Sequence, residues 1–170
     1  FFSHITTSAG TISGGATTTD KYYWRRDGSD MVIRFEYQQS TAGTDASTGV
    51  YRIGLPSGYS ADLSKITPYT AEDTSGTQYI EAGTGFCGNV FAGDENVGYQ
   101  SFGHGILYDS TKVRIVLFNH GGPNTSWWNS NGPYNFDADH FGFTGELRIP
   151  IQGWNSNFNP LLSMPLVNIG

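Results

Sequence analysis

Acidic side chains in the last third of the chain come closest to acid and base chemistry by type and spacing. Asp137 and Asp139 lie two residues apart, which places both carboxylates on the same face of an extended segment. Paired carboxylates are what glycoside hydrolysis requires, and Asp94 with Glu95 forms a second pair. The surrounding stretch is rich in Asn and Asp, and such loops usually bond their own backbone. We therefore expect solvated loop carboxylates and no enzyme activity.

The same stretch offers ligands for a metal ion. Asn135, Asp137 and Asp139 alternate as oxygen ligands would in a calcium loop, and His120 and His140 could meet across the mouth of the loop. Neither set has enough ligands for a convincing site. The sequence also lacks a nucleophile elbow, an HExxH motif, a phosphate-binding loop and an EF-hand loop. We expect no metal and no cofactor, with Asp137 and Asp139 as weak metal candidates.

The stretch from Asn119 to Phe141 suits binding better than catalysis. It is the longest non-periodic run, beyond the ~12 to 15 residues at which a structureless loop needs a reason. It combines flat aromatic faces with amide groups, and the candidate ligand-binding residues are Trp127, Trp128, Asn129, Asn131 and Tyr134. A sugar offers the matching apolar C–H face and rim of hydroxyl groups. Alternatively, one Trp fills the end of the domain and the other packs against a neighbouring subunit.

Charge and hydropathy exclude several classes of partner. The chain of 170 residues has a formal net charge of −6 and no basic stripe, which argues against nucleic acid and anionic membrane surfaces. No apolar run approaches the ~20 residues that a membrane-spanning helix needs. We therefore expect no nucleic acid partner and no membrane insertion.

Two short features have simple structural readings. Cys87 is the only cysteine, so it cannot form an internal disulfide, and its apolar neighbours predict a small buried side chain. The run Phe102-Gly103-His104-Gly105 has a spacing too permissive to indicate a phosphate site.

Strands must position these residues, and the clearest strand signal lies between Tyr22 and Gln39. The turn-forming run Asp27-Gly28-Ser29-Asp30 separates two alternating segments, which predicts an antiparallel hairpin. In its second strand the residues predicted to face a core are Met31, Ile33, Phe35 and Tyr37.

Further strands follow the same signals. They are expected over Gly49–Leu55, Gln78–Glu81, Gly85–Ala92, Val97–Leu107, Lys112–Phe118 and Gly145–Trp154. Glycines interrupt the middle of this region, where bulges, bends or close backbone approach are expected. Pro150 at an outward position makes the last strand either an edge strand or one that ends at the sheet border. One short helical turn from Ser60 would end before Pro68.

The overall composition favours an all-β fold. Charged residues make up 14% of the chain and aromatic residues 15%, and there are 23 glycines. Sharply bent strands suit a barrel-like sandwich better than a flat sheet. We expect one antiparallel β-sandwich head domain over residues 21–170, preceded by an N-terminal arm or linker over residues 1–20.

Four motifs resemble a known family. They are Tyr23-Trp24-Arg25-Arg26-x-Gly28, Met31-Val32-Ile33-Arg34, Ile53-Gly54-Leu55-Pro56-Ser57-Gly58-Tyr59 and Ile149-Pro150-Ile151-Gln152-Gly153-Trp154. They cover under a third of the chain and resemble a recurrent domain at the ends of bacteriophage tail fibres, tail spikes and related appendages. Such domains are similar to the jelly-roll heads of the complement and tumour-necrosis-factor superfamily, which assemble as trimers. The resemblance implies a jelly-roll-like β-sandwich, a homotrimer and a virion surface protein that binds host structures.

The function expected from sequence is therefore attachment without catalysis. The chain would act in the virion, outside the cell, alongside other virion proteins, and would bind a host cell-surface glycan or protein. One alternative is a capsid decoration or a purely structural fibre-tip module. Another is a carbohydrate-binding module or a carbohydrate-active enzyme.

Overall fold

The protein is all-β, as the composition predicts. The computed structural model describes residues 1–8, 10–44, 49–70, 85–94, 99–118, 125–127, 136 and 139–155. Its elements are the 3-10 turn η1 (Phe2–His4) and the strands β1 (Ile5–Thr7), β2 (Thr17–Asp27), β3 (Asp30–Gln39), β4 (Tyr51–Gly54), β5 (Phe86–Asp94), β6 (Tyr99–Asp109), β7 (Lys112–Phe118), β8 (Thr125–Trp127) and β9 (Phe141–Pro150). Within these residues there is no α-helix, and hence none long and apolar enough to cross a membrane.

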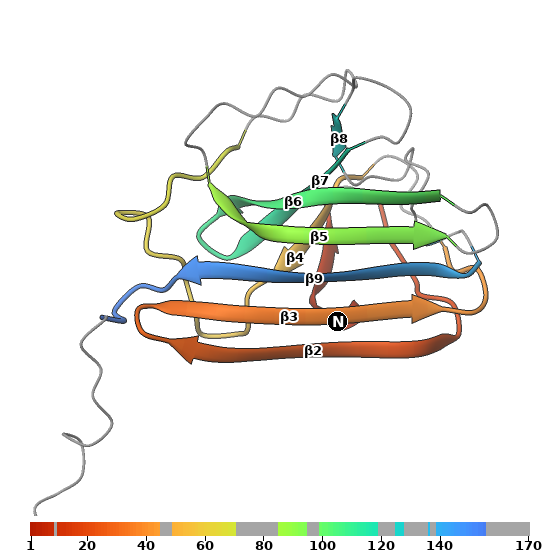
Figure 1. Ribbon diagram of the computed structural model, residues 1–170, viewed down its shortest axis with the longest axis horizontal. Helices are drawn as coiled ribbons and strands as arrows, with labels where there is room; N and C mark the ends of the chain where they lie inside the picture. Colours follow the sequence, from red (N-terminus) through yellow and green to blue (C-terminus); the bar gives the residue numbers. More distant parts are fainter. Residues whose placement is uncertain are drawn as a thin grey trace, which may run out of the picture.

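All strands belong to one antiparallel sheet that curls strongly into a half-barrel. The strand order is β1-β4-β7-β6-β5-β9-β3-β2, and β8 pairs with β7 outside this path. In Figure 1 the strands β2, β3, β9 and β5 lie side by side at the front, while β4 and β7 run behind them at a steep angle. The curl gives the sheet an inner face that encloses the main core and an outer face, part of which is covered where Val50, Ile106, Val116 and Tyr69 form a second, smaller cluster.

The hairpin β2–β3 forms as its sequence predicts. Asp27 pairs with Asp30 across the turn, and Gly28 takes a φ of 63°, a left-handed conformation that glycine adopts without steric cost. The inward residues of β3 are almost fully buried, and these are Met31, Ile33, Phe35 and Tyr37. The predicted inward face of β3 is therefore confirmed, although Val32 on the opposite face is buried as well.

Strand β9 lies in the middle of the sheet. It pairs with β3 on one side and with β5 on the other. Pro150 is its last residue, so the missing N–H of proline falls at the border of the ladder. Of the two readings of Pro150, the strand that ends at the sheet border is the observed one.

Glycines on the inner face make room for the core. A Cβ atom added to Gly103 would lie 2.2 Å from the carbonyl oxygen of Val116, and one added to Gly105 would lie 2.3 Å from a methyl group of Leu147. Gly88 sits at a register shift between β5 and β6 with a φ of 148°. The predicted link between glycines and bulges or close approach holds at these positions.

Side chains join the two edges of the curled sheet. The imidazole of His4, just before β1, stacks on the ring of Tyr22 in β2 with centroids 3.7 Å apart. The Tyr22 hydroxyl donates a hydrogen bond of 3.0 Å to the carbonyl oxygen of Gly54 in β4. Burial raises the pKa of Tyr22, so the hydroxyl stays protonated and able to donate.

One end of the half-barrel is tied together by the segment that follows β4. The backbone N–H of Ala61 bonds to the carbonyl oxygen of Ser110 at 2.7 Å, and that of Asp62 bonds to Pro150 at 2.8 Å. The segment thus links the β6–β7 turn to the end of β9. The helical turn expected from Ser60 is instead a single turn over Asp62–Ile66, where the Asp62 carboxylate accepts a bond from the Ser64 N–H.

Residues on both sides of position 20 contribute to the same sheet. Strand β1 pairs with β4, strand β2 begins at Thr17, and the ring of Phe1 packs against Phe35 in the core. The separate arm over residues 1–20 stays a prediction. The strand expected over Gln78–Glu81 lies outside the described residues.

A matched pair of glycine substitutions tests the close packing of the inner face. We expect Gly103→Ala to lower the free energy of unfolding by about 1–3 kcal/mol, because its Cβ would overlap a strand carbonyl. Gly142→Ala is the control, since its Cβ would meet nothing nearer than 3.8 Å, and a change below about 1 kcal/mol is expected. Urea denaturation measures both, and equal losses would contradict the packing argument.

The thiol of Cys87 should be inert in the folded chain. It is buried, and burial raises its pKa to about 12, so almost no thiolate is present at pH 8. A thiol-specific chromogenic reagent should leave the native protein unmodified at pH 8 and should react with one thiol per chain in urea. Rapid reaction without denaturant would show that Cys87 is accessible.

Candidate functional site: the outer face of the sheet

Most of the sequence-predicted binding residues lie outside the described part of the chain. Trp127 is the last residue of β8, where its backbone pairs with Val116, but its side chain is outside the description. The other candidates that lie outside the described residues are Trp128, Asn129, Asn131, Tyr134 and Asp137. Their proposed contacts with a ligand stay predictions.

The described acidic and histidine residues do not gather into a metal site. Asp139 is exposed and its carboxylate lies 3.7 Å from Nδ1 of the partly exposed His140. Within the described residues no group of three or more His, Cys, Asp or Glu side chains could hold a metal ion. His120 and Glu95 lie outside this part of the chain, as does the side chain of Asp94.

The strand register aligns outward side chains in two neighbouring rows across the outer face. The first row runs from β2 to β7 through Lys21, Glu36, Thr144, Phe91, Phe102 and Phe118. The second row runs the same way through Tyr23, Arg34, Glu146, Asn89, His104 and Val116. Because β-strands alternate their side chains, both rows point away from the core. We call this surface the outer face.

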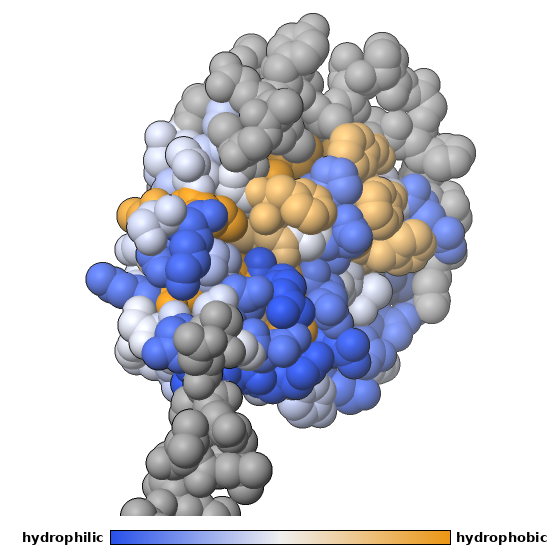
Figure 2. Space-filling model, turned by 60° about the vertical axis from the view of Figure 1, so that its left-hand side comes forward, coloured by the Kyte–Doolittle hydropathy of each residue, from blue (hydrophilic) through white to orange (hydrophobic). Residues whose placement is uncertain are grey.

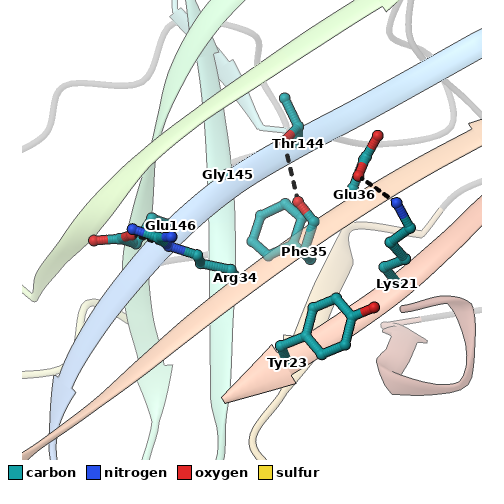
Figure 3. Close-up of a pocket in the computed structure, with 8 residues that line it drawn as sticks. All are labelled: Lys21, Tyr23, Arg34, Phe35, Glu36, Thr144, Gly145 and Glu146. Carbon is teal, nitrogen blue, oxygen red and sulfur yellow. Dashed lines mark hydrogen bonds and ion pairs between the residues drawn. The ribbon is translucent and has the colours of Figure 1, made fainter. Parts of the chain in front are cut away.

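The half of the outer face on β2, β3 and β9 is charged. Lys21 pairs with Glu36 at 3.1 Å, and Arg34 pairs with Glu146. As Figure 3 shows, the two ion pairs and Tyr23 surround a shallow hollow of about 450 Å³. All four charged side chains are exposed, so the pairs add little to stability.

The half on β5, β6 and β7 is aromatic. Phe86, Phe91 and Phe102 keep 55%, 41% and 49% of their surface exposed. Phe118 lies beside Phe102, with nearly parallel rings 6.3 Å apart. Figure 2 shows an apolar patch on this side of the molecule, next to a strongly hydrophilic one. Exposed apolar patches of this kind are typical of interaction surfaces.

His104 lies at the centre of the aromatic half. Its imidazole meets the rings of Phe86, Phe102 and Phe118 nearly at right angles, with centroids 5.1, 5.5 and 4.9 Å away. Its Nδ1 lies 3.1 Å from Oδ1 of Asn89 on the neighbouring strand. Burial among these neighbours lowers the pKa of His104, so the ring is neutral at pH 7.

The bond to Asn89 fixes the tautomer of His104. The Asn89 oxygen can only accept, so the imidazole carries its proton on Nδ1 and donates it. The other ring nitrogen, Nε2, then holds a lone pair and can accept a hydrogen bond. The Asn89 amide nitrogen remains a donor. The site therefore combines one neutral acceptor and one neutral donor within a frame of phenyl rings.

The sequence analysis did not predict this site, although it considered one run of residues that belongs to it. Phe102-Gly103-His104-Gly105 was tested only as a phosphate loop. The sequence signal that could have indicated the site is the reversed alternation of this strand, in which the outward positions hold aromatic residues and the inward positions hold glycines. A strand that hides glycine and exposes phenylalanine is unusual, because large apolar side chains normally face the core.

The motifs that carry the family resemblance meet at one end of the half-barrel. Trp24 and Tyr59 pack edge to face with centroids 4.9 Å apart, and Tyr59 contacts Trp154 at 5.5 Å. The guanidinium carbon of Arg26 lies 4.9 Å from the Trp154 ring centre. Three of the four motifs thus contribute to a single packed cluster.

Comparisons with known proteins give no relative: the chain matches no protein-family model, no curated protein and no solved structure.

The aromatic surroundings of His104 can be tested by titration. We expect NMR to place the pKa of His104 below its ordinary value of 6.5, and Phe86→Ala to raise it, because water then reaches the imidazole. A depressed pKa means that this histidine favours folding above pH ~6.5 and that its contribution is lost as the pH falls through the folded pKa. Tyr23→Ala, far along the outer face, is the control and should leave the titration of His104 unchanged.

Proposed function

We propose that the chain is a non-enzymatic attachment module, the head domain of a bacteriophage tail fibre or related virion appendage, which binds the host cell surface. The observation that carries the proposal is the outer face, where a rigid sheet presents exposed phenylalanine rings around a neutral donor and acceptor. A preformed surface of this kind binds with little loss of conformational entropy.

The backbone supports such a rigid surface. Strands β9, β5 and β6 are each paired on both sides, so the backbone that carries the rings is hydrogen-bonded to two neighbouring strands. Rigid elements hold a recognition surface more accurately than loops do. The aromatic half of the outer face is therefore ready to bind before any partner arrives.

The finer description of the fold belongs to the same proposal. A curled antiparallel sheet in which β4 neighbours β7, and β3 neighbours β9, has the long crossovers of Greek-key folds and is compatible with a jelly roll. The four motifs that resemble phage appendage domains support assembly as a homotrimer. Repetition around an axis multiplies weak contacts into useful avidity.

The proposal assigns the chain to the outside of the virion and to recognition without covalent chemistry. Its partners are copies of itself, other virion proteins and a host glycan or surface protein. The stretch that contains Trp127 and Trp128 is the other recognition surface expected from sequence, and the backbone of Trp127 pairs with Val116, the last residue of the second row. A structural module without a ligand is the alternative, and it would leave the exposed rings unexplained.

Oligomeric state and cell binding together test this function. Native mass spectrometry of the purified chain should give three copies, and the fluorescently labelled protein should sediment with cells of at least one strain in a bacterial panel. The control is protein unfolded in urea and diluted, which should not sediment with cells. A chain that stays monomeric and sediments with no strain would contradict the proposal.

A further inference from the structure

We propose that the aromatic half of the outer face, centred on the His104–Asn89 pair, is a binding site for a neutral, hydroxyl-rich glycan chain. The inference deepens the proposed function and rests on it, because it names the chemical class of the surface ligand and the residues that contact it.

The hydrogen-bonding groups of the pair are complementary to hydroxyl groups. Within the described residues, Nε2 of His104 and the amide nitrogen of Asn89 have no other partner, so one acceptor and one donor remain to be satisfied. A hydroxyl group both donates and accepts, and two neighbouring hydroxyls on a sugar satisfy both groups together.

Charged ligands fit this pair less well. A phosphate or carboxylate group only accepts, which leaves Nε2 of His104 without a donor. An ammonium group only donates, which leaves the Asn89 amide without an acceptor. The cations in the two rows, Lys21 and Arg34, are each already paired with a glutamate. The donor and acceptor pattern therefore favours a neutral ligand.

The rings around the pair supply the apolar half of sugar recognition. Phe86, Phe102 and Phe118 surround the imidazole, and Phe91 lies one strand further along the first row. The C–H groups of a pyranose pack on a phenyl ring while its hydroxyls turn toward polar groups. A protein–protein interface that excludes water would instead bury the Asn89 donor and the His104 acceptor without partners, which costs free energy.

The extent of the surface points to a chain and not to a single sugar. Strands β5, β6 and β7 are consecutive neighbours, so their outward rings span two strand spacings, about 10 Å. A single pyranose covers less than this width. The rows continue into the charged hollow, which offers hydroxyl groups further donors and acceptors, among them Tyr23 and Thr144.

A glycan array and matched variants test the inference on the full chain. Neutral oligosaccharides should be retained and acidic ones should not, and the tightest neutral oligosaccharide then serves as the probe in calorimetric titration. We expect Phe102→Ala to weaken its binding about tenfold through loss of a stacking surface. Asn89→Ala should weaken it about three- to tenfold through loss of the donor. Phe91→Ala is a second stacking variant, and Leu63→Ala, which removes an exposed apolar side chain that belongs to neither row, is the control expected to change affinity less than about twofold.

The pH dependence gives a readout that a packing role would not produce. Affinity should fall as the pH drops below the pKa of His104, because the protonated ring can no longer accept at Nε2. His104→Gln should retain part of the affinity through its amide oxygen but should lose this pH dependence. Circular dichroism melts of each variant separate loss of binding from loss of fold.

Several outcomes would overturn the inference. If the array retains only acidic glycans, or no glycans, the ligand is not a neutral glycan. If Phe102→Ala and Asn89→Ala bind the probe with unchanged affinity, the glycan does not bind at these residues. If Phe102→Ala changes the oligomeric state instead of glycan affinity, the aromatic half is an interface between copies. If the protein binds cells and the oligosaccharide probe does not inhibit that binding, the proposed attachment function holds but the glycan site is refuted. Glycan binding without any cell binding would refute attachment alone.

Discussion

The need to bury one face of a single sheet governs the rest of this structure. Within the described residues no helix covers the sheet, so the sheet must curl until its inner face meets itself. The inner face is crowded with rings, among them Phe35, Tyr37 and Phe143, and glycines at neighbouring inward positions leave room for the large side chains. At Gly145 an added Cβ would lie 2.7 Å from the Phe35 ring. Large aromatic side chains on some strands and glycines on others therefore fit together to fill one core.

The same constraint explains why aromatic side chains lie on the outer face. On β6 the inward positions are occupied by Gly103 and Gly105, so Phe102 and His104 between them must point outward by the pleat of the strand. Register then decides which outward residues become neighbours. It joins Phe91 to Phe102 and Asn89 to His104, which lie 11 and 15 positions apart in sequence. A one-residue slip of β6 would turn Phe102 and His104 toward the core and separate them from Phe91 and Asn89.

The ends of the half-barrel show how short motifs acquire a role through tertiary contact. Trp24, Tyr59 and Trp154 come from three separate segments and form one cluster. The segment between β4 and residue 62 completes the same end by bonding to Ser110 and Pro150. Three of the four motifs that resemble phage appendage domains therefore supply packing residues at one end of the half-barrel. In the proposed function, recognition falls to other residues, whose identity packing does not fix.

Local pattern determined the strands, because alternation, turn residues and glycine content act within a few positions. The hairpin at Gly28, the strand Lys112–Phe118 and the inward face of β3 all follow from it. Alternation along Lys112–Phe118 places Arg114 on the face opposite Val113, Ile115 and Leu117. Only the tertiary structure showed that Arg114 is nonetheless fully buried, with its guanidinium 4.2 Å from the Tyr108 ring. The outer aromatic site was equally hidden, since pairing between strands distant in sequence is set by the packing of the whole sheet and not by any local preference.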